Sequence, residues 1–310
     1  MKKILLATSI LAATTGFAAA EVAVSGNGRM GVVYDGTNVQ FSNRIRVIFT
    51  MTGETDTGLA FGASIRADNS GGGNSGGFRD ANGGNEGSIF ISGAFGKLEM
   101  GNVASAAEAV IGDLSGVGYT GLGDASDMDY LVQDGADIIQ GPSALYTYSV
   151  NDLTFAASMT DGSIGVADAL GNYSATDTDT AYSLAVGYAA GDYKVGLGYS
   201  KRGDADQIAL GGAATFGSTT VKAVYLTTDS DAPNSGVDIV GLSGDFAIAS
   251  GPTLTAFYKN YMPDVGDDFA VYGIGAKYDL GGGATFAAGI VDTDVNDGDP
   301  IADVGLTFAF

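Results

Sequence analysis

Short segments in which large apolar residues alternate with small or polar ones recur from Val22 to the last residue, Phe310. In "YKVGLGYSK", residues 193–201, every second residue is Tyr, Val or Leu, and Gly, Ser and Lys stand between them. This period of two is what a β-strand with one apolar face requires. Beyond the first twenty residues no segment sustains helical spacing for long, so we expect an all-β protein.

Two kinds of connection alternate strictly between these segments. Seven are short and turn-like: Gly53–Gly58, Ala94–Lys97, Asn151–Asp152, Ala189–Asp192, Phe216–Thr219, Ala249–Pro252 and Leu280–Gly283. Eight belong to a second, generally longer set: Asp35–Asn38, Asp68–Asn85, Ala104–Gly141, Asp161–Thr178, Gly203–Ala205, Asp229–Gly236, Met262–Asp267 and Thr293–Pro300. Sixteen consecutive antiparallel strands would place the turns at one end of a sheet and the loops at the other. Because a single open sheet of this size is unusual, the pattern predicts a closed 16-stranded antiparallel barrel.

The period of two alone does not tell whether the apolar face meets lipid, as in a membrane barrel, or a protein core, as in a soluble sandwich. The residues around that face distinguish the two. Three pairs of tyrosines stand six residues apart, ~20 Å along a strand, which matches the apolar band of a membrane barrel: Tyr182 and Tyr188, Tyr193 and Tyr199, Tyr272 and Tyr278. The opposite face is mainly Gly, Ser, Thr and charged residues, which favours a transmembrane barrel with a wet interior. The alternative is a soluble secreted β-sheet protein, such as an adhesin, with the apolar face buried in its core.

The N-terminus has the features of a cleaved signal peptide. Lys2 and Lys3 precede an apolar stretch, and Ala18 and Ala20 suit a signal peptidase, so we expect residues 1–20 to be removed and 21–310 to form one domain. Without the two lysines, 12 basic residues face 36 acidic ones. This acidity argues against nucleic acid as a partner.

The sequence offers few of the residue types that enzymatic catalysis uses. The sequence contains neither histidine nor cysteine. A serine–histidine pair and the usual zinc ligands therefore cannot be assembled, and we predict no catalytic residues and no required cofactor.

Arginines gather near the N-terminus. If the apolar residues of the first three strands face lipid, four arginines turn into the lumen on neighbouring strands: Arg29, Arg44, Arg46 and Arg66. We expect them to form a basic wall on one side of the pore.

The long connection Ala104–Gly141 carries the opposite charge and contains no basic residue. Its acids are Glu108, Asp113, Asp124, Asp127, Asp129, Asp134 and Asp137. Folded inward, the loop would face the arginines across water, and the resulting field and gap would select solutes by charge and size. Crowded carboxylates also suit Ca²⁺, for which Glu108, Asp113, Asp127 and Asp129 are the candidate ligands.

Several stretches resemble the general diffusion porins of alphaproteobacteria, the Rhodobacter type: "SGNGRMGVVYDG", "FSNRIRVIFTMTGETDTGLAFGAS", "ISGAFGKLEMGN", "GDLSGVGYTGL" and "KYDLGGGA". The resemblance spans the chain. It implies a homotrimer in the outer membrane, among lipid and lipopolysaccharide, with the loop between strands five and six folded into each barrel. It also implies bound calcium, and a terminal phenylalanine, Phe310, that is read by the barrel insertion machinery.

The combined prediction is a passive outer-membrane channel for small hydrophilic solutes and ions. A substrate-specific channel is the alternative, for which inward lysines could provide a ladder of sites: Lys194, Lys222, Lys259 and Lys277. The sign of the ion selectivity stays open.

Overall fold

The computed structural model describes residues 20–68, 87–132, 143–160, 163–167, 173–177, 180–230, 235–294 and 299–310. The strands are β1 (Glu21–Tyr34), β2 (Val39–Glu54), β3 (Ala60–Asp68), β4 (Gly87–Gly93), β5 (Gly96–Gly101), β6 (Ser143–Val150), β7 (Leu153–Thr160), β8 (Ser163–Ala167), β9 (Tyr173–Asp177), β10 (Ala181–Ala190), β11 (Tyr193–Arg202), β12 (Ala205–Phe216), β13 (Thr219–Ser230), β14 (Val237–Ala247), β15 (Thr253–Pro263), β16 (Phe269–Gly281), β17 (Ala284–Thr293) and β18 (Ile301–Ala309). A six-residue helix, α1 (Ala106–Ile111), lies between β5 and β6.

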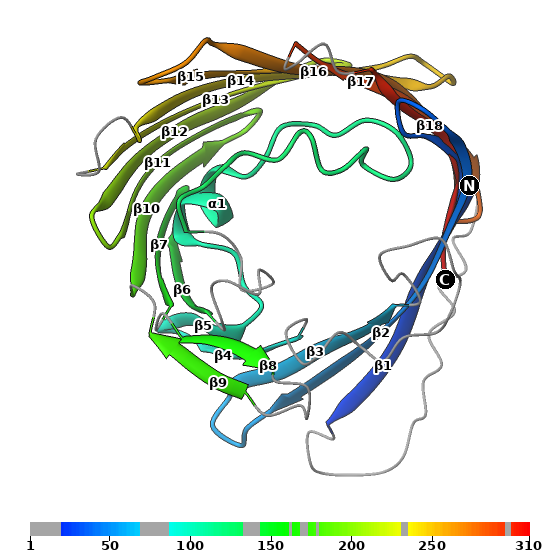
Figure 1. Ribbon diagram of the computed structural model, residues 1–310. Helices are drawn as coiled ribbons and strands as arrows, with labels where there is room; N and C mark the ends of the chain where they lie inside the picture. Colours follow the sequence, from blue (N-terminus) through cyan, green and yellow to red (C-terminus); the bar gives the residue numbers. More distant parts are fainter. Residues whose placement is uncertain are drawn as a thin grey trace.

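Sixteen of these strands form one closed antiparallel barrel (Figure 1). Each strand pairs with its neighbour in sequence, with β7 pairing β10, and β18 pairs with β1 to close the ring. The prediction of a closed 16-stranded barrel is confirmed. One difference lies in the connection 161–178, expected to be a plain loop, which contains the separate hairpin β8–β9.

The last residue completes the closure. The main-chain N–H of Phe310 donates to the carbonyl of Gly26 at 2.8 Å, and the N–H of Gly26 donates back to the carbonyl of Phe310 at 3.2 Å. The ring of Phe310 is 82% exposed and stacks on Phe308. No free strand edge therefore remains where the chain ends.

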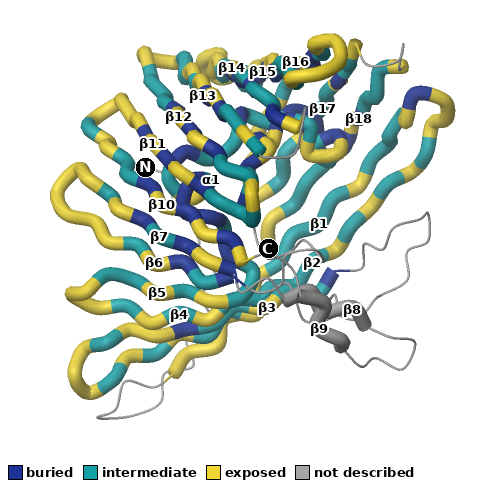
Figure 2. Tube along the Cα trace, turned by 60° about the vertical axis from the view of Figure 1, so that its left-hand side comes forward, coloured by how far each residue is buried: buried dark blue, intermediate teal, exposed yellow. Residues whose placement is uncertain are grey.

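The outer face of the barrel is apolar and uncovered. Exposed and less exposed residues alternate along the strands (Figure 2). On β11 the outward residues Val195, Leu197 and Tyr199 are exposed, while Gly196 and Gly198 between them are buried. A soluble protein rarely exposes so large an apolar surface. In the part of the chain that is described, no helix has the length and apolar character needed to cross a membrane.

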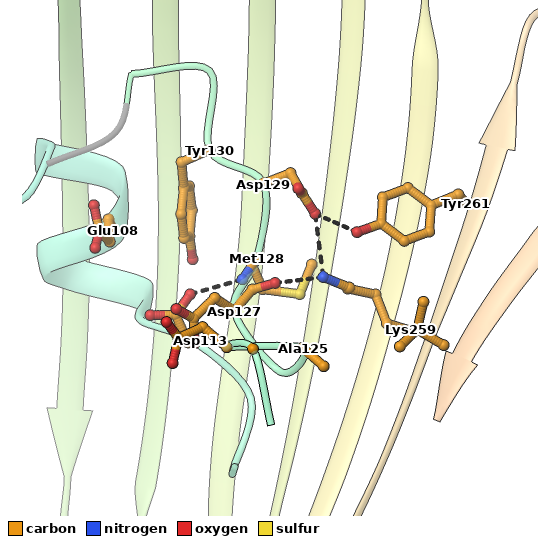
Figure 3. A pocket seen from close by; sticks show the side chains of 12 residues that line it. Glu108, Asp113, Ala125, Asp127, Met128, Asp129, Tyr130, Lys259 and Tyr261 are labelled. Carbon is orange, nitrogen blue, oxygen red and sulfur yellow. Dashed lines mark hydrogen bonds and ion pairs between the residues drawn. The ribbon is translucent and has the colours of Figure 1, made fainter. Parts of the chain in front are cut away.

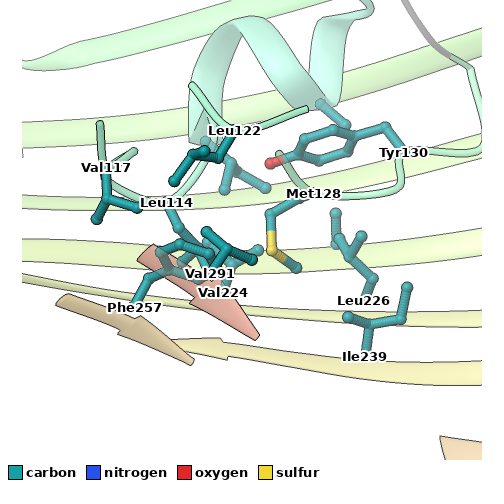
Figure 4. Close-up of a cluster of buried hydrophobic side chains, with 13 residues drawn as sticks. Leu114, Val117, Leu122, Met128, Tyr130, Val224, Leu226, Ile239, Phe257 and Val291 are labelled. Atoms are coloured by element: carbon teal, nitrogen blue, oxygen red, sulfur yellow. The ribbon is translucent and has the colours of Figure 1, made fainter. Parts of the chain in front are cut away.

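The connection between β5 and β6 runs inside the barrel, where Figure 1 shows it lying along β10 to β18. We call its described part, residues 102–132, the inward loop. Its apolar residues and inward-facing apolar residues of the strands form a core within the lumen (Figure 4). The members of this lumen core are Ala107, Ile111, Leu114, Val117, Leu122, Met128, Tyr130, Ala209, Val224, Leu226, Ile239, Phe257 and Val291. The inner face is thus less uniformly polar than the composition of the strands suggested, because the loop keeps water from part of it.

Candidate functional site

The inward loop begins with a short capped helix attached to the wall. Ser105 accepts the N–H of Glu108 at 3.2 Å, and the Glu108 carboxylate accepts the N–H of Ser105 at 3.4 Å, which is a capping box. The N–H of Ala106 donates to Ser158 Oγ at 2.8 Å, and that of Ala107 to Ser183 Oγ at 3.1 Å. The first helical turn is therefore bound to the inner faces of β7 and β10.

Three lysines hold the flanks of the loop by its main-chain carbonyls. Lys222 on β13 donates to the carbonyl of Asp113, and Lys277 on β16 donates to that of Gly116 at 3.2 Å. Lys259 on β15, which is 4% exposed, donates to the carbonyl of Asp127 at 2.6 Å. These lysines face inward as predicted, but they bind the loop. Three of the four lysines proposed as a ladder for a substrate-specific channel are therefore bound to the loop, and the fourth, Lys194 on β11, is exposed.

Acidic side chains of the loop line a recess of about 440 Å³ (Figure 3). Five predicted constriction residues are among its walls, together with Tyr130, Lys259 and Tyr261: Glu108, Asp113, Asp124, Asp127 and Asp129. The Asp129 carboxylate accepts from Tyr261 Oη at 2.6 Å and from Lys259 Nζ at 3.3 Å. The other two predicted acids, Asp134 and Asp137, lie outside the described residues.

Asp127 has an unusual proton affinity. Burial raises the pKa of its carboxyl to about 6, and the negative charges of Asp113 and Asp124 act in the same direction. Lys259 opposes the shift without cancelling it. Burial likewise raises the pKa of the Tyr130 hydroxyl, which donates to the carbonyl of Gly112 at 2.9 Å. The recess is therefore a crowded anionic surface.

Three of the four candidate calcium ligands are otherwise engaged. Glu108 caps α1, Asp113 Oδ1 accepts the N–H of Met128 at 2.8 Å, and Asp129 is paired with Lys259. Among the described residues, no group of three or more acids is arranged to hold a metal ion. Calcium binding stays a prediction.

The arginines lie together on three adjacent strands, as predicted. Arg29 and Arg44 are register partners between β1 and β2, and Arg46 pairs with Asp68 across β2 and β3. Arg46 forms a fork with the Asp68 carboxylate at 2.7–3.0 Å, and Arg66 lies 3.5 Å from it. We call Arg29, Arg44, Arg46 and Arg66 the arginine wall.

The arginine wall and the acidic recess belong to different parts of the ring: the recess includes residues of β15 and β16, three to six steps from β1, β2 and β3. In the ring of sixteen strands, eight steps separate β3, which carries Arg66, from β13, which carries the lysine bound to Asp113. We call residues 118–120 the tip of the inward loop. The tip approaches the arginine wall, because Arg29 Nη1 donates to the carbonyl of Thr120 at 3.1 Å. Both charged surfaces therefore lie within the lumen, and one main-chain contact joins the loop to the arginine wall.

Several contacts of the loop were not anticipated. Asp303 on β18 accepts three hydrogen bonds from Tyr119 and Thr120. Gln207 on β12 accepts the N–H of Leu131 at 2.9 Å and donates to the carbonyl of Asp129 at 3.0 Å. Their inward positions could be read from the strand period, but nothing in the sequence identified the loop as their partner.

Comparisons with known proteins agree with this architecture. The family model described as "Gram-negative porin" matches residues 7–298. A porin of Rhodobacter capsulatus is 41% identical over 320 residues, which cover 94% of this chain and all of the relative.

Two solved structures extend the comparison. A porin refined at 1.8 Å resolution has a TM-score of 0.79 at 39% identity, covering 94% of this chain and all of that one. A mutant porin of Rh. blastica has a TM-score of 0.71 at 22% identity and the same coverage, which supports the fold. The chain therefore belongs to the Gram-negative porin family and is an outer-membrane general porin, a diffusion channel and not an enzyme.

Proposed function

We propose that solutes cross this channel between the arginine wall and the acidic face of the inward loop, and that this gap is the constriction. The supporting observation is the placement of the loop: Lys222 on β13 and Lys259 on β15 bind the carbonyls of Asp113 and Asp127, and these two strands stand four to eight positions from β1, β2 and β3. A loop attached in this way reduces the cross-section that is open to solute.

The mechanism requires no chemical step. The width of the gap excludes large solutes. Opposed rows of fixed charge produce a field across the path, which orients dipolar solutes and favours ions according to the local balance of charge. Each of the two charged sides is an ion-selective surface that can be changed on its own.

Replacing Arg44, Arg46 and Arg66 by glutamine tests the proposal. A charge about 10 Å from the path contributes about 0.4 kcal/mol in water. Allowing for screening by salt, removing three charges should raise the cation-to-anion permeability ratio about three- to eightfold. The measurement is the reversal potential of planar bilayers under a salt gradient.

Two further variants serve as controls. Adding Asp68→Asn to the triple variant removes the carboxylate that loses its partners, and Arg202→Gln removes an arginine from β11, on the other side of the ring. The proposal predicts a smaller effect for Arg202→Gln than for Arg44→Gln. Equal shifts for these two, or an unchanged reversal potential in the triple variant, contradict it.

The proposal also covers how the channel assembles and what surrounds it in the membrane. The resemblance supports a homotrimer, for which conductance steps in groups of three are expected. The exposed ring of Phe310 supports recognition by the insertion machinery, so Phe310→Ala should lower the yield of inserted barrel. Lipopolysaccharide is proposed as a neighbour of the outer face, to be tested by its retention on the purified protein.

Calcium is proposed as a structural ion of the recess, because Glu108, Asp113, Asp127 and Asp129 all line it. Equilibrium dialysis with calcium measures the stoichiometry. Binding no stronger than that of magnesium would remove calcium from the proposal.

A further inference from the structure

A buried carboxylate on the last strand contacts the tip of the inward loop. Asp303 lies on the inner face of β18 and is only 5% exposed. Its register partners on the adjoining strands are Val33 and Gly289, neither of which carries a charge. The groups that compensate this buried charge must come from elsewhere.

The loop provides them. Oδ1 of Asp303 accepts the N–H of Tyr119 at 3.1 Å, and Oδ2 accepts the N–H and the hydroxyl of Thr120 at 2.8 and 2.5 Å. Within the described chain, all the hydrogen-bond donors recorded for Asp303 belong to these two residues. Hydrogen bonds to an ionised acceptor are stronger than those between neutral groups, so one side chain binds two consecutive residues of the tip.

The backbone at this contact is shaped for a close approach. Gly118 has a φ of +77°, and a Cβ there would lie 2.3 Å from Asp303 Oδ1. On the strand side, a Cβ at Gly289 would lie 2.4 Å from the nitrogen of Gly118. Both positions therefore need glycine, and the tip lies directly on the backbone of β17 with no room for water between them.

Thr120 connects the tip of the loop to the arginine wall. The carbonyl of Thr120 accepts from Arg29, while its N–H and hydroxyl bind Asp303. Ser158 and Ser183 at the base of the loop each accept from one main-chain N–H, and Lys277 on its flank donates to one carbonyl. The tip is the part of the loop that borders the arginines, and Asp303 makes three of its contacts.

We propose that Asp303 is a positioning residue that sets the size limit of the channel by holding the tip of the inward loop against β18. The inference rests on the proposed constriction, but it concerns the width of the gap and not its charge. Without the carboxylate, the tip is released and larger solutes pass.

The test compares Asp303→Asn, Thr120→Val and Asp279→Asn. Thr120→Val removes the hydroxyl without changing charge. Asp279→Asn removes one negative charge from the inner face of β16, where the carboxylate accepts from Gly281 close to the turn. Each protein is reconstituted into liposomes, and swelling rates are measured with sugars of increasing size and divided by the rate for the smallest. This ratio does not depend on how many channels insert, so a loss of folded protein alone leaves it unchanged.

We expect the ratio for a disaccharide to rise at least about twofold in Asp303→Asn and Thr120→Val, because each weakens the charged contact, and to stay at the wild-type value in Asp279→Asn. The double variant should exceed the larger single effect only slightly, since both changes remove one contact. If Asp303→Asn does not fold, Thr120→Val and Gly118→Ala decide. Unchanged ratios in these variants, or an equal rise in Asp279→Asn, overturn the inference. Failure of the charge-selective constriction would appear separately, as an unchanged reversal potential in the triple arginine variant.

Discussion

The two halves of the lumen differ, although both are built from strands with the same alternation. On β2 and β3, inward residues such as Arg46 and Arg66 line an open recess of the lumen. On β12 to β17, inward residues such as Leu226 and Ile239 are at most 1% exposed because the inward loop covers them. The inner face of one barrel is therefore a wet, charged wall on one side and a packed core on the other.

Several inward glycines lie where the loop approaches the wall, including Gly31 on β1, where an added Cβ would lie 2.9 Å from the Tyr119 ring. Gly198 allows contact with Ala107 of α1, Gly241 with Leu114 and Met128, and Gly289 with Gly118. In each case an added Cβ would come within 3 Å of the loop. On β2, the positions from Gln40 to Ile48 that face inward contain no glycine. Small inward residues mark where another segment lies against the wall, as glycine in strands often does.

The largest expected effect comes from the packed half. Leu226→Ala removes a fully buried side chain from the lumen core and should cost about 2–5 kcal/mol of the free energy of unfolding. Leu242→Ala on β14 is the matched control, because Leu242 faces outward and is 51% exposed. Equilibrium refolding into lipid vesicles from urea measures both, and equal losses would show that the loop contributes no core.

Much of the barrel could be predicted from the sequence. The period of two gave the direction of each side chain, and the alternation of connections gave the number of strands. Both depend on backbone geometry, which acts within a few residues. The inward position of Arg29, Arg44, Arg46 and Arg66 followed from the same rule.

What these inward residues meet could not be predicted in this way. The strand period places Lys259 and Asp303 inside the barrel, yet their partners lie 132 and about 180 residues away in sequence. The hairpin β8–β9 was missed because its two strands have five residues each, too few to show a clear alternation. Contacts between the loop and the wall depend on how the loop folds as a whole.

The next largest effect concerns a lysine that binds the inward loop in the packed half. Lys259→Met leaves the carbonyl of Asp127 and the carboxylate of Asp129 without this cation. A hydrogen bond to a charged group contributes about 1.5–3 kcal/mol, so the variant should lose about this much stability and become more cation-selective. Lys194→Met is the control: Lys194 is an exposed lysine on β11, so its loss should shift the reversal potential and leave the free energy of unfolding nearly unchanged. If Lys259→Met is as stable as Lys194→Met, Lys259 does not anchor the loop.

The smallest effect tests the charge of the recess through its pH dependence. Because the pKa of Asp127 is raised to about 6, its carboxyl is largely ionised at pH 7 and largely protonated at pH 5, while ordinary aspartates stay ionised. The cation-to-anion permeability ratio should therefore fall by less than about twofold as the pH drops from 7 to 5, since less than one charge is lost. The midpoint should lie near pH 6. Asp127→Asn should abolish this step, whereas the triple arginine variant, which retains Asp127, should keep it.

The sign of the stability change distinguishes this carboxyl from one that is held by an ion pair. A pKa that is higher in the folded state than in the unfolded state means that folding takes up a proton. Stability should then rise as the pH falls from about 6 towards about 4. A carboxyl held by an ion pair would show the reverse trend. Urea titrations at pH 7 and pH 5, with Asp127→Asn for comparison, measure this difference. If the pH-dependent change in stability survives Asp127→Asn, the titrating group lies elsewhere on the loop. The charges of the recess would then not be crowded enough to raise the pKa of Asp127.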